Sequence, residues 1–344
     1  MQANTLGRAL GVAFCAAISV AAVGTPAFAD PTPTGDYRTL TGVGSDTTQD
    51  VMGGLSESIT DASGAKIIAN WNASGASPIK TKATDCEIAR PNGSTAGRNA
   101  LKLSETQGSS SQGCVDFARS SSSTSFVEGG TGTWIPFGVD AMTYAINENS
   151  DLPRNLTTVQ LERVYQCLTD NIAGEPVVPL LIQPGSGTRA FWNQKVGITE
   201  TEIANGDYPC LQSLNNSVQE HNGAVLDGHN DYILPYSVAQ YIAQSNANTV
   251  VGGVTVAVDD RRGTAVLGSV NGIAPRTAEG TLNTELPYRR DVYNIVPTAD
   301  LGVPVIDEVF TGADSAICTR TNIIQAYGFG ATDTCGSTDL TGNL

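Results

Sequence analysis

Residues 177–192 read Val-Val-Pro-Leu-Leu-Ile-Gln-Pro-Gly-Ser-Gly-Thr-Arg-Ala-Phe-Trp. The apolar first part predicts a strand, the small residues in the middle a turn, and the last part the start of a helix. The first N–H groups of a helix lack partners within it, and the helix dipole favours negative charge there. With the side chains of Ser186, Thr188 and Arg189, the turn is suited to bind an anion. The same residues also make an ordinary helix cap, and this stretch alone leaves both interpretations open.

The order of strand, turn and helix recurs along the chain. Strands are expected over residues 37–43, 66–71, 115–119, 140–146 and 233–236, and helices over residues 51–59, 92–101, 157–168 and 238–242. Two further strand-like runs cover residues 263–271 and 291–297, before a helix around residues 323–327. Such alternation predicts an α/β fold with parallel sheets covered by helices, in which ligands bind at the carboxyl ends of strands.

The first 29 residues have the pattern of a secretory signal peptide. Arg8 supplies the positive charge, residues 9–23 are apolar, and the segment ends in Ala-Phe-Ala at Ala29. Cleavage after Ala29 predicts a secreted, extracytoplasmic protein. Cys15 would leave with this segment, because a phenylalanine precedes it where a lipoprotein signal needs a small residue. No later run approaches the roughly 18 apolar residues of a membrane helix, so no membrane insertion is expected.

Six cysteines follow the signal segment, and an even number in an exported chain indicates disulfides. Sequence alone permits many pairings, but the spacing forms three neighbouring couples. None of the cysteines has Cys-x-x-Cys spacing, and the chain's two histidines, His221 and His229, lie in a polar segment interpreted as a surface loop. No metal site and no cofactor are therefore expected. The expected disulfides are Cys86–Cys114, Cys167–Cys210 and Cys318–Cys335.

Charge and length limit the classes of function. The formal net charge of −15 at pH 7 argues against nucleic acid and anionic membranes as partners. A small anion is compatible with this charge, because a desolvated pocket is governed by its own donors and surface carboxylates are screened over about 8–10 Å. The 344 residues correspond to one large or two medium domains with a sizeable core, and a monomer is expected.

Four predicted strand-to-helix turns share the chemistry of the first one. In a two-lobed α/β fold they can all face one cleft and offer hydroxyls, backbone N–H groups, arginines and one carboxylate. That combination suits a tetrahedral oxyanion. Each turn taken singly is equally compatible with an ordinary cap, and residues 120–125 with a flexible loop. The turns are Ser45, Asp46 and Thr47; Ser94 and Thr95; Arg119, Ser120 and Ser121; and Ser186, Gly187, Thr188 and Arg189.

In their order along the chain and in their residues, these turns resemble those of the phosphate-binding subunit of the phosphate ABC transporter. That family has a type II periplasmic-binding-protein fold. The family's Gly-x-Gly-x-Thr turn corresponds to residues 42–47, its Gly-Ser-Ser-Gly-Gly to residues 93–97, its Val-Asp-Phe-Gly-Ala-Ser-Asp to residues 115–121, and its Gly-Ser-Gly-Thr is intact at residues 185–188. Residues 287–335 look like the secreted actinobacterial branch. The resemblance implies a ligand cleft between two lobes, with residues 30–140 and 237–344 in one lobe and 141–236 in the other. Hinge strands are expected near residues 140–146 and 231–236.

The resemblance implies phosphate contacts from Asp46, Thr47, Ser94, Ser186, Gly187 and Thr188. Two positions depart from the family. Its proton-accepting carboxylate falls on Ser121, and its arginine falls on Ile182. Arg119 and Arg189 could replace the cation and Asp46 the acceptor. A carboxylate would favour hydrogen phosphate over sulfate, because sulfate has no proton to donate. Asp46 could equally be a helix N-cap.

The function expected from these residues is capture of inorganic phosphate, or of a similar oxyanion such as sulfate, molybdate or an organic phosphate, for an ABC permease. An interaction protein at the cell surface that kept the fold without transport is a second interpretation, because no lipoprotein tether or sorting signal is visible. An exported phosphatase or other hydrolase is disfavoured, because there is no Gly-x-Ser-x-Gly elbow and no metal-spaced cluster of histidine and aspartate. We therefore expect a binding protein and not an enzyme.

Overall fold

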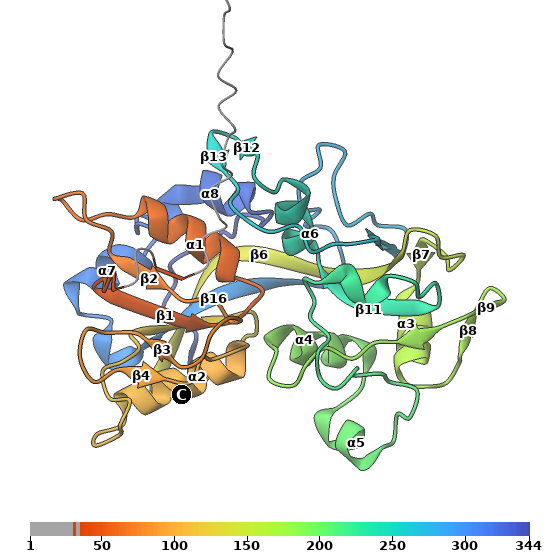
Figure 1. The fold of residues 1–344 in the computed structure, drawn as a ribbon, viewed down its shortest axis with the longest axis horizontal. Coiled ribbons are helices and arrows are strands. Elements are labelled where there is room, and N and C mark those ends of the chain that lie inside the picture. Colours follow the sequence, from red (N-terminus) through yellow and green to blue (C-terminus); the bar gives the residue numbers. More distant parts are fainter. Residues whose placement is uncertain (1–29, 32–34) are drawn as a thin grey trace, which may run out of the picture.

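The computed structural model describes residues 30–31 and 35–344 (Figure 1). The expected signal peptide, its cleavage site and Cys15 lie outside the described residues. No helix within the described part of the chain has both the length and the apolar character needed to cross a membrane.

A mixed sheet forms the centre of the molecule, with nine strands among the described residues. Its order is β10-β11-β6-β16-β5-β1-β2, and β14 and β17 also pair with β6. The strands are β1 (Leu40–Gly44), β2 (Ile68–Asn70), β5 (Phe117–Ser120), β6 (Gly132–Asn147), β10 (Val178–Pro179), β11 (Tyr232–Ser237), β14 (Ala265–Leu267), β16 (Arg289–Pro297) and β17 (Thr341–Gly342).

The expectation of purely parallel sheets is wrong at the centre. β1 is parallel to β2 and β5, and β10 is parallel to β11, as a strand-and-helix alternation predicts. β6 and β16, however, run antiparallel to each other and to their other neighbours. β6 is also longer than expected: residues 132–141 pair with β16, and residues 142–147 pair with β11 and β14. The long strand thus joins two half-sheets end to end.

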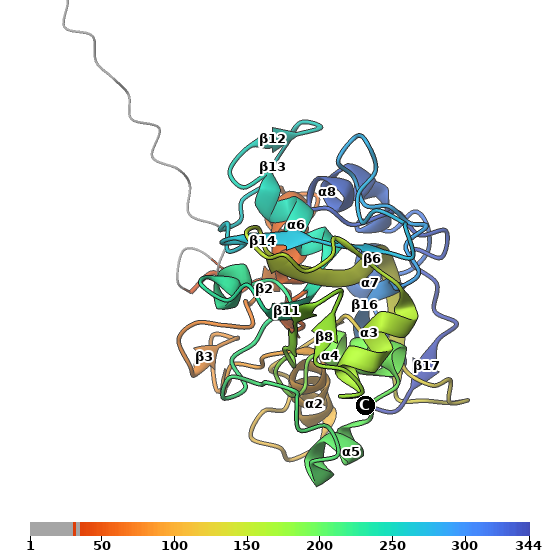
Figure 2. The same cartoon turned by 90° about the vertical axis from the view of Figure 1, so that its right-hand side faces the viewer.

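Helices cover both faces of the sheet, with α1, α6 and α8 on one side and α2 and α4 on the other (Figures 1 and 2). The predicted capping box at Thr157 and Gln160 is present at the start of α3. The helices are α1 (Gln49–Ser58), α2 (Ser94–Glu105), α3 (Thr158–Tyr165), α4 (Gly187–Val196), α5 (Glu200–Asn205), α6 (Val238–Ser245), α7 (Pro304–Phe310) and α8 (Thr321–Ala326), with 3-10 turns η1 (Gly223–Leu226), η2 (Thr298–Asp300) and η3 (Cys318–Arg320).

Four short two-stranded sheets lie in the connections between these elements, within the described part of the chain. They are β3 (Ile79–Lys80) with β4 (Glu87–Ile88), β7 (Asn155–Leu156) with β15 (Ser269–Val270), β8 (Asn171–Ile172) with β9 (Glu175–Pro176), and β12 (Val250–Val251) with β13 (Val254–Thr255). All three expected disulfides are confirmed: Cys86–Cys114, Cys167–Cys210 and Cys318–Cys335.

Separate hydrophobic cores lie along the two halves of β6. Ile135 and Phe137 belong to a core with α1, α7 and α8, while Met142 and Tyr144 belong to a core with α3 and α4. The chain after residue 237 contributes to both cores, because β16 packs in the first and residues 270–288 pack in the second. The division into lobes at residues 140 and 236 stays a prediction, and the junction of the two half-sheets lies at the centre of β6.

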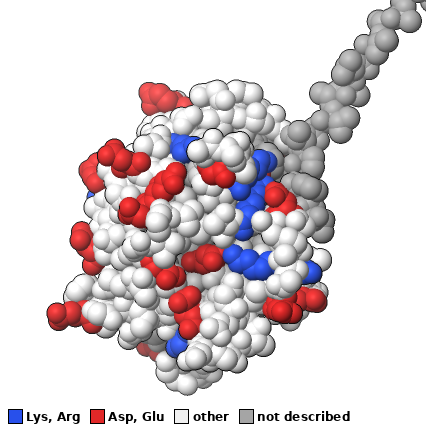
Figure 3. All heavy atoms as spheres, turned by 90° about the vertical axis from the view of Figure 1, so that its left-hand side faces the viewer, with Lys and Arg blue, Asp and Glu red and all other residues white. Residues whose placement is uncertain are grey.

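Charged side chains on the face shown in Figure 3 are dispersed, with acidic groups scattered over it and basic groups gathered in a few spots. The formal net charge of −15 gives this surface no long-range attraction for anions. An anion site has to rely on its own local donors.

Candidate oxyanion site at the junction of the two half-sheets

The four predicted turns meet in one buried cluster of hydroxyl groups. Ser121 Oγ lies 3.1 Å from Ser45 Oγ, 3.3 Å from Thr47 Oγ1 and 3.3 Å from Ser94 Oγ. Thr47 Oγ1 is in turn 2.9 Å from Thr188 Oγ1. All five side chains are buried. We call Ser45, Thr47, Ser94, Ser121 and Thr188 the hydroxyl cluster.

Regular elements hold this cluster in place. β1 and β5 are parallel neighbours, so Ser45 and Ser121 directly follow two adjacent strand ends. The N-termini of α2 and α4 touch, because the Thr95 N–H donates to Gly185 O at 3.2 Å. Gly187 is needed for this approach, since a Cβ there would lie 2.5 Å from Ser94 Oγ. Two segments about 90 residues apart in sequence therefore meet at their helix starts.

Glu220, which the sequence analysis does not single out, places its carboxylate against the cluster. It is fully buried, and its Oε1 accepts hydrogen bonds from Thr47 Oγ1 at 2.5 Å and Thr188 Oγ1 at 2.9 Å. Burial raises the pKa of Glu220, but the Thr47 hydrogen bond and the charge of Arg290 act against burial, and the pKa is lowered overall. The hydroxyl cluster thus already holds an anionic oxygen, one that belongs to the chain itself.

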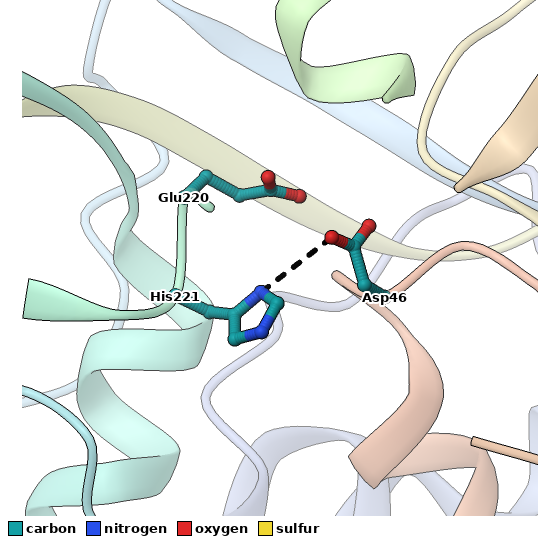
Figure 4. A group of neighbouring side chains, drawn as sticks. All are labelled: Asp46, Glu220 and His221. Carbon is teal, nitrogen blue, oxygen red and sulfur yellow. Dashed lines mark ion pairs between the residues drawn. The ribbon is translucent and has the colours of Figure 1, made fainter. Parts of the chain in front are cut away.

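Asp46 and His221 lie next to Glu220 (Figure 4). Asp46 Oδ2 accepts a hydrogen bond from Gln183 Nε2 at 3.2 Å and is 3.8 Å from His221 Nδ1, which has no hydrogen-bond partner. Burial, and then the charge of Glu220, raise the pKa of Asp46 well above its ordinary value. Burial, and then Arg261, lower the pKa of His221 to about 3, so its imidazole is neutral at neutral pH.

The interpretation of both histidines as surface loop residues is correct for one of them. His229 is exposed and stacks on the Tyr232 ring, with ring centroids 4.1 Å apart. His221 is 1% exposed, because the segment before η1 folds inward between β11 and α6. The alternative of Asp46 as an N-cap is also not what the structure has, since Thr48 occupies that position of α1.

Arg290 supplies the positive charge at the cluster. Its Nη2 donates to Thr188 Oγ1 at 2.7 Å and to Asp140 Oδ2 at 3.2 Å. Asp140 is held in turn by the Ser237 hydroxyl at 3.0 Å. The Nε and Nη1 groups of Arg290 are buried without a partner, and its guanidinium lies 5.1 Å from the Phe191 ring centre. Two donors therefore remain available beside the hydroxyl cluster.

The two arginines expected to supply this charge are engaged elsewhere. Arg119 is fully buried, and its guanidinium donates to the carbonyls of Gly42, Gly44 and Ser45. These hydrogen bonds hold the end of β1 in place. Arg189 pairs with Glu200, with Nη2 2.5 Å from Oε2. Both side chains are thus structural in this conformation. Arg290, rather than Arg119 or Arg189, donates to a side chain of the hydroxyl cluster in this structure.

The remaining predicted residues lie at the edge of the site. Ser186 caps α4, because its Oγ accepts from the N–H groups of Thr188 and Arg189, and it also lies 3.4 Å from Glu220 Oε2. Ser120 Oγ is used within its own turn, where it donates to Ser122 O. Thr95 is exposed and contributes its backbone N–H to the contact with Gly185.

A signal for one of the missed residues is present in the sequence. Arg290 lies two residues before the apolar Val292 on a strand, so the two side chains share one face of the sheet. Because that face is the inward one, Arg290 is expected to be a buried arginine that needs partners. Glu220 and His221 belong to an irregular polar segment without periodicity, and no local pattern places them.

A cavity of about 640 Å³ opens beside the cluster. It is bounded by residues 121–125, by Ala190 and Phe191 of α4, and by the start of β16 at Arg289–Asp291. Ser121 and Arg290 line both the cavity and the cluster. The site therefore has space next to its donors.

The sequence matches no protein-family profile and no curated protein. Solved structures do share the fold. A protein from Clostridium perfringens, described as a phosphate ABC transporter substrate-binding protein and solved with bound phosphate, aligns with a TM-score of 0.53 at 17% identity over 86% of this chain and 99% of its own. An ABC-type phosphate transport receptor from Vibrio cholerae gives 0.53 at 16% identity over 85% and 100%. This chain therefore shares the fold of these two proteins, one described as a substrate-binding protein and the other as a transport receptor.

Proposed function

We propose that this chain is an extracytoplasmic solute-binding protein that closes over a tetrahedral oxyanion, with inorganic phosphate as the first candidate. One observation carries the proposal: hydroxyls from separate turns converge on a buried anionic oxygen, that of Glu220. The unpartnered Nε and Nη1 groups of Arg290 lie beside them. Hydroxyl and guanidinium donors around one buried point are the donor set that a tetrahedral oxyanion requires.

In this proposal the solute enters while the two sides of the cleft are apart and takes over the donors that Glu220 holds in the closed form. Glu220 and Asp46 then face the bound anion as acceptors. They supply what Ser121 lacks, because hydrogen phosphate keeps a proton that a carboxylate can accept, whereas sulfate has none.

The two fold neighbours support phosphate as the candidate, because both are phosphate receptors and one contains bound phosphate. Delivery of the anion to an ABC permease is the role that would follow for an exported protein of this fold. The cavity beside Ser121 leaves room for a substituent, so an organic phosphate is the closest variant of the proposal.

A second candidate function rests on the same carboxylate. Because Glu220 fills the hydroxyl cluster, the closed form is complete without a solute. An interaction protein at the cell surface that kept the fold without transport would have this property.

Titration of the purified protein with phosphate, with sulfate as competitor, separates the two candidates. A solute receptor should release or take up heat and change the fluorescence of Trp192, which lies in α4 against Tyr165 and Tyr288. Sulfate should displace phosphate only at much higher concentration. No heat and no fluorescence change with phosphate, sulfate or a phosphate monoester would leave the interaction protein as the better account. Turnover of the monoester would instead contradict the assignment as a binding protein.

A further inference from the structure

Asp46, Glu220 and His221 form a compact trio of side chains with metal-ligating atoms. One carboxylate oxygen of each acid and one imidazole nitrogen all lie within 4.8 Å of one another. The three side chains are 1%, 0% and 1% exposed. Figure 4 shows the imidazole Nδ1 directed at the Asp46 carboxylate, with the Glu220 carboxylate alongside. Asp46 comes from the turn after β1, and the other two come from the segment before η1.

The trio is not accounted for by ordinary packing. His221 Nδ1 is buried without a hydrogen-bond partner, although nearly all buried polar atoms have one. Two carboxylates are buried side by side, and the buried cation next to them, Arg290, is shared with a third carboxylate, Asp140. A buried charge is costly unless it is paired. The trio thus places two buried carboxylates beside an imidazole nitrogen that has no hydrogen-bond partner.

We propose that Asp46, Glu220 and His221 bind a divalent transition-metal ion of the Zn²⁺ class. Such an ion accepts the imidazole lone pair, compensates both carboxylates, and is commonly held in proteins by histidine nitrogen with aspartate or glutamate oxygen. Mg²⁺ and Ca²⁺ prefer all-oxygen sites, so the histidine selects against them.

Neighbouring groups orient the three ligands, as the outer partners of a metal site do. Gln183 Nε2 donates to Asp46 Oδ2, and Thr47 and Thr188 donate to Glu220 Oε1. The His221 carbonyl accepts a hydrogen bond from Gln244 Nε2 at 2.8 Å, which holds its backbone. The ligands come from two distant segments, so metal binding would stabilise the closed arrangement.

The metal site also bears on how the oxyanion is bound, and this one step rests on the proposed function. Three protein ligands leave a fourth position of a tetrahedral ion open. Glu220 also contacts Thr47 and Thr188 of the hydroxyl cluster, so an oxyanion could bind the ion and the hydroxyls together. The metal would then add its positive charge to that of Arg290 beside the hydroxyl cluster.

Calorimetric titration of chelator-treated protein with Zn²⁺, in the absence of phosphate, tests the site directly. We expect one ion per chain, a raised melting temperature, and no comparable effect of Mg²⁺ or Ca²⁺. His221→Gln should weaken Zn²⁺ binding at least about 100-fold, more than the loss of an orienting partner costs. His229→Gln, which changes the exposed histidine, should bind like the wild type. Circular dichroism of both variants checks that they fold.

The inference is overturned if the wild-type protein binds no Zn²⁺, or if His221→Gln binds it as tightly as His229→Gln does. A separate phosphate titration of the chelator-treated protein tests the proposed function. Phosphate binding without any Zn²⁺ binding would keep the receptor and remove the metal. Zn²⁺ binding without phosphate binding would keep the metal site and remove the receptor.

Discussion

Two sets of side chains with opposite chemistry meet at the site. The first set, the donor side, consists of the hydroxyl cluster and the guanidinium of Arg290. The second set, the acceptor side, consists of the carboxylates of Asp46 and Glu220 and the neutral imidazole of His221. Donors alone would suit any oxyanion, and acceptors alone would suit a cation. Their juxtaposition indicates a ligand that brings an anion together with a proton or a metal ion, and each variant below alters one side of this comparison.

The largest effect is expected on the donor side, from the double substitution Thr47→Val and Thr188→Val. Each hydroxyl now donates to an anionic oxygen, and such a bond contributes about 1.5–3 kcal/mol. Loss of both should weaken phosphate binding at least about 100-fold, as measured by calorimetry. Thr255→Val, on the exposed strand β13, is the matched control and should bind normally. Affinity within about threefold of the wild type would place the anion elsewhere.

Arg290→Gln and Arg189→Gln compare the arginine that touches the cluster with one expected from sequence to do so. Arg290 contacts Thr188 and has two unpartnered donors, whereas Arg189 is committed to Glu200. We expect about 10–100-fold weaker phosphate binding for Arg290→Gln, corresponding to one lost charge-assisted contact. For Arg189→Gln the dissociation constant should stay within about threefold of the wild-type value. The reverse order would restore Arg189 as the binding cation.

On the acceptor side, Glu220→Gln should reduce the preference for phosphate over sulfate. A carboxylate accepts the proton of hydrogen phosphate and repels sulfate, while an amide also offers donors to sulfate. We expect the ratio of the two dissociation constants to fall at least about tenfold, since one charged contact changes sign. Competition titrations measure it, with Glu308→Gln on the exposed surface of α7 as control. An unchanged ratio would mean that Glu220 does not face the anion.

Asp46→Asn should stabilise the metal-free protein, and more so at higher pH. Burial, followed by the charge of Glu220, raises the folded-state pKa of Asp46 above its ordinary 3.8. The folded chain therefore keeps a proton that the unfolded chain releases, and stability falls as the pH rises from about 4 toward the folded-state pKa. The substitution removes this loss. The gain in melting temperature should be larger at about pH 8 than at about pH 5, and Asp314→Asn, an exposed control, should show no such trend. A gain that shrinks with rising pH would contradict the raised pKa.

The sequence predicts those parts of the site that lie at the ends of regular elements. Ser45, Ser94, Ser121 and Thr188 are found because a strand end or helix start can be recognised from hydrophobic spacing and small hydroxyl residues. The meeting of Ser45 and Ser121 follows from the parallel pairing of β1 and β5.

On the acceptor side the sequence predicts Asp46 but not Glu220 and His221, which reach the site through an irregular segment whose path depends on tertiary packing. The antiparallel direction of β6 and β16 is not predicted either, because periodicity identifies a strand but not its direction. Arg119 is misassigned because a local pattern cannot tell which way a buried guanidinium points.

The smallest effect is expected within the turn at residues 185–188, where two hydroxyls do different work. Ser186 Oγ caps α4 and reaches Glu220 only at 3.4 Å, whereas Thr188 Oγ1 lies within the cluster. Ser186→Ala should cost about 1 kcal/mol of stability through the lost cap, a fall in melting temperature of about 1–3 °C at this chain length. Thr188→Val should reverse the pattern and reduce phosphate affinity more than stability. Thermal melts and phosphate titrations of the two variants check this, and equal loss of affinity would give Ser186 the ligand role that the family resemblance implies.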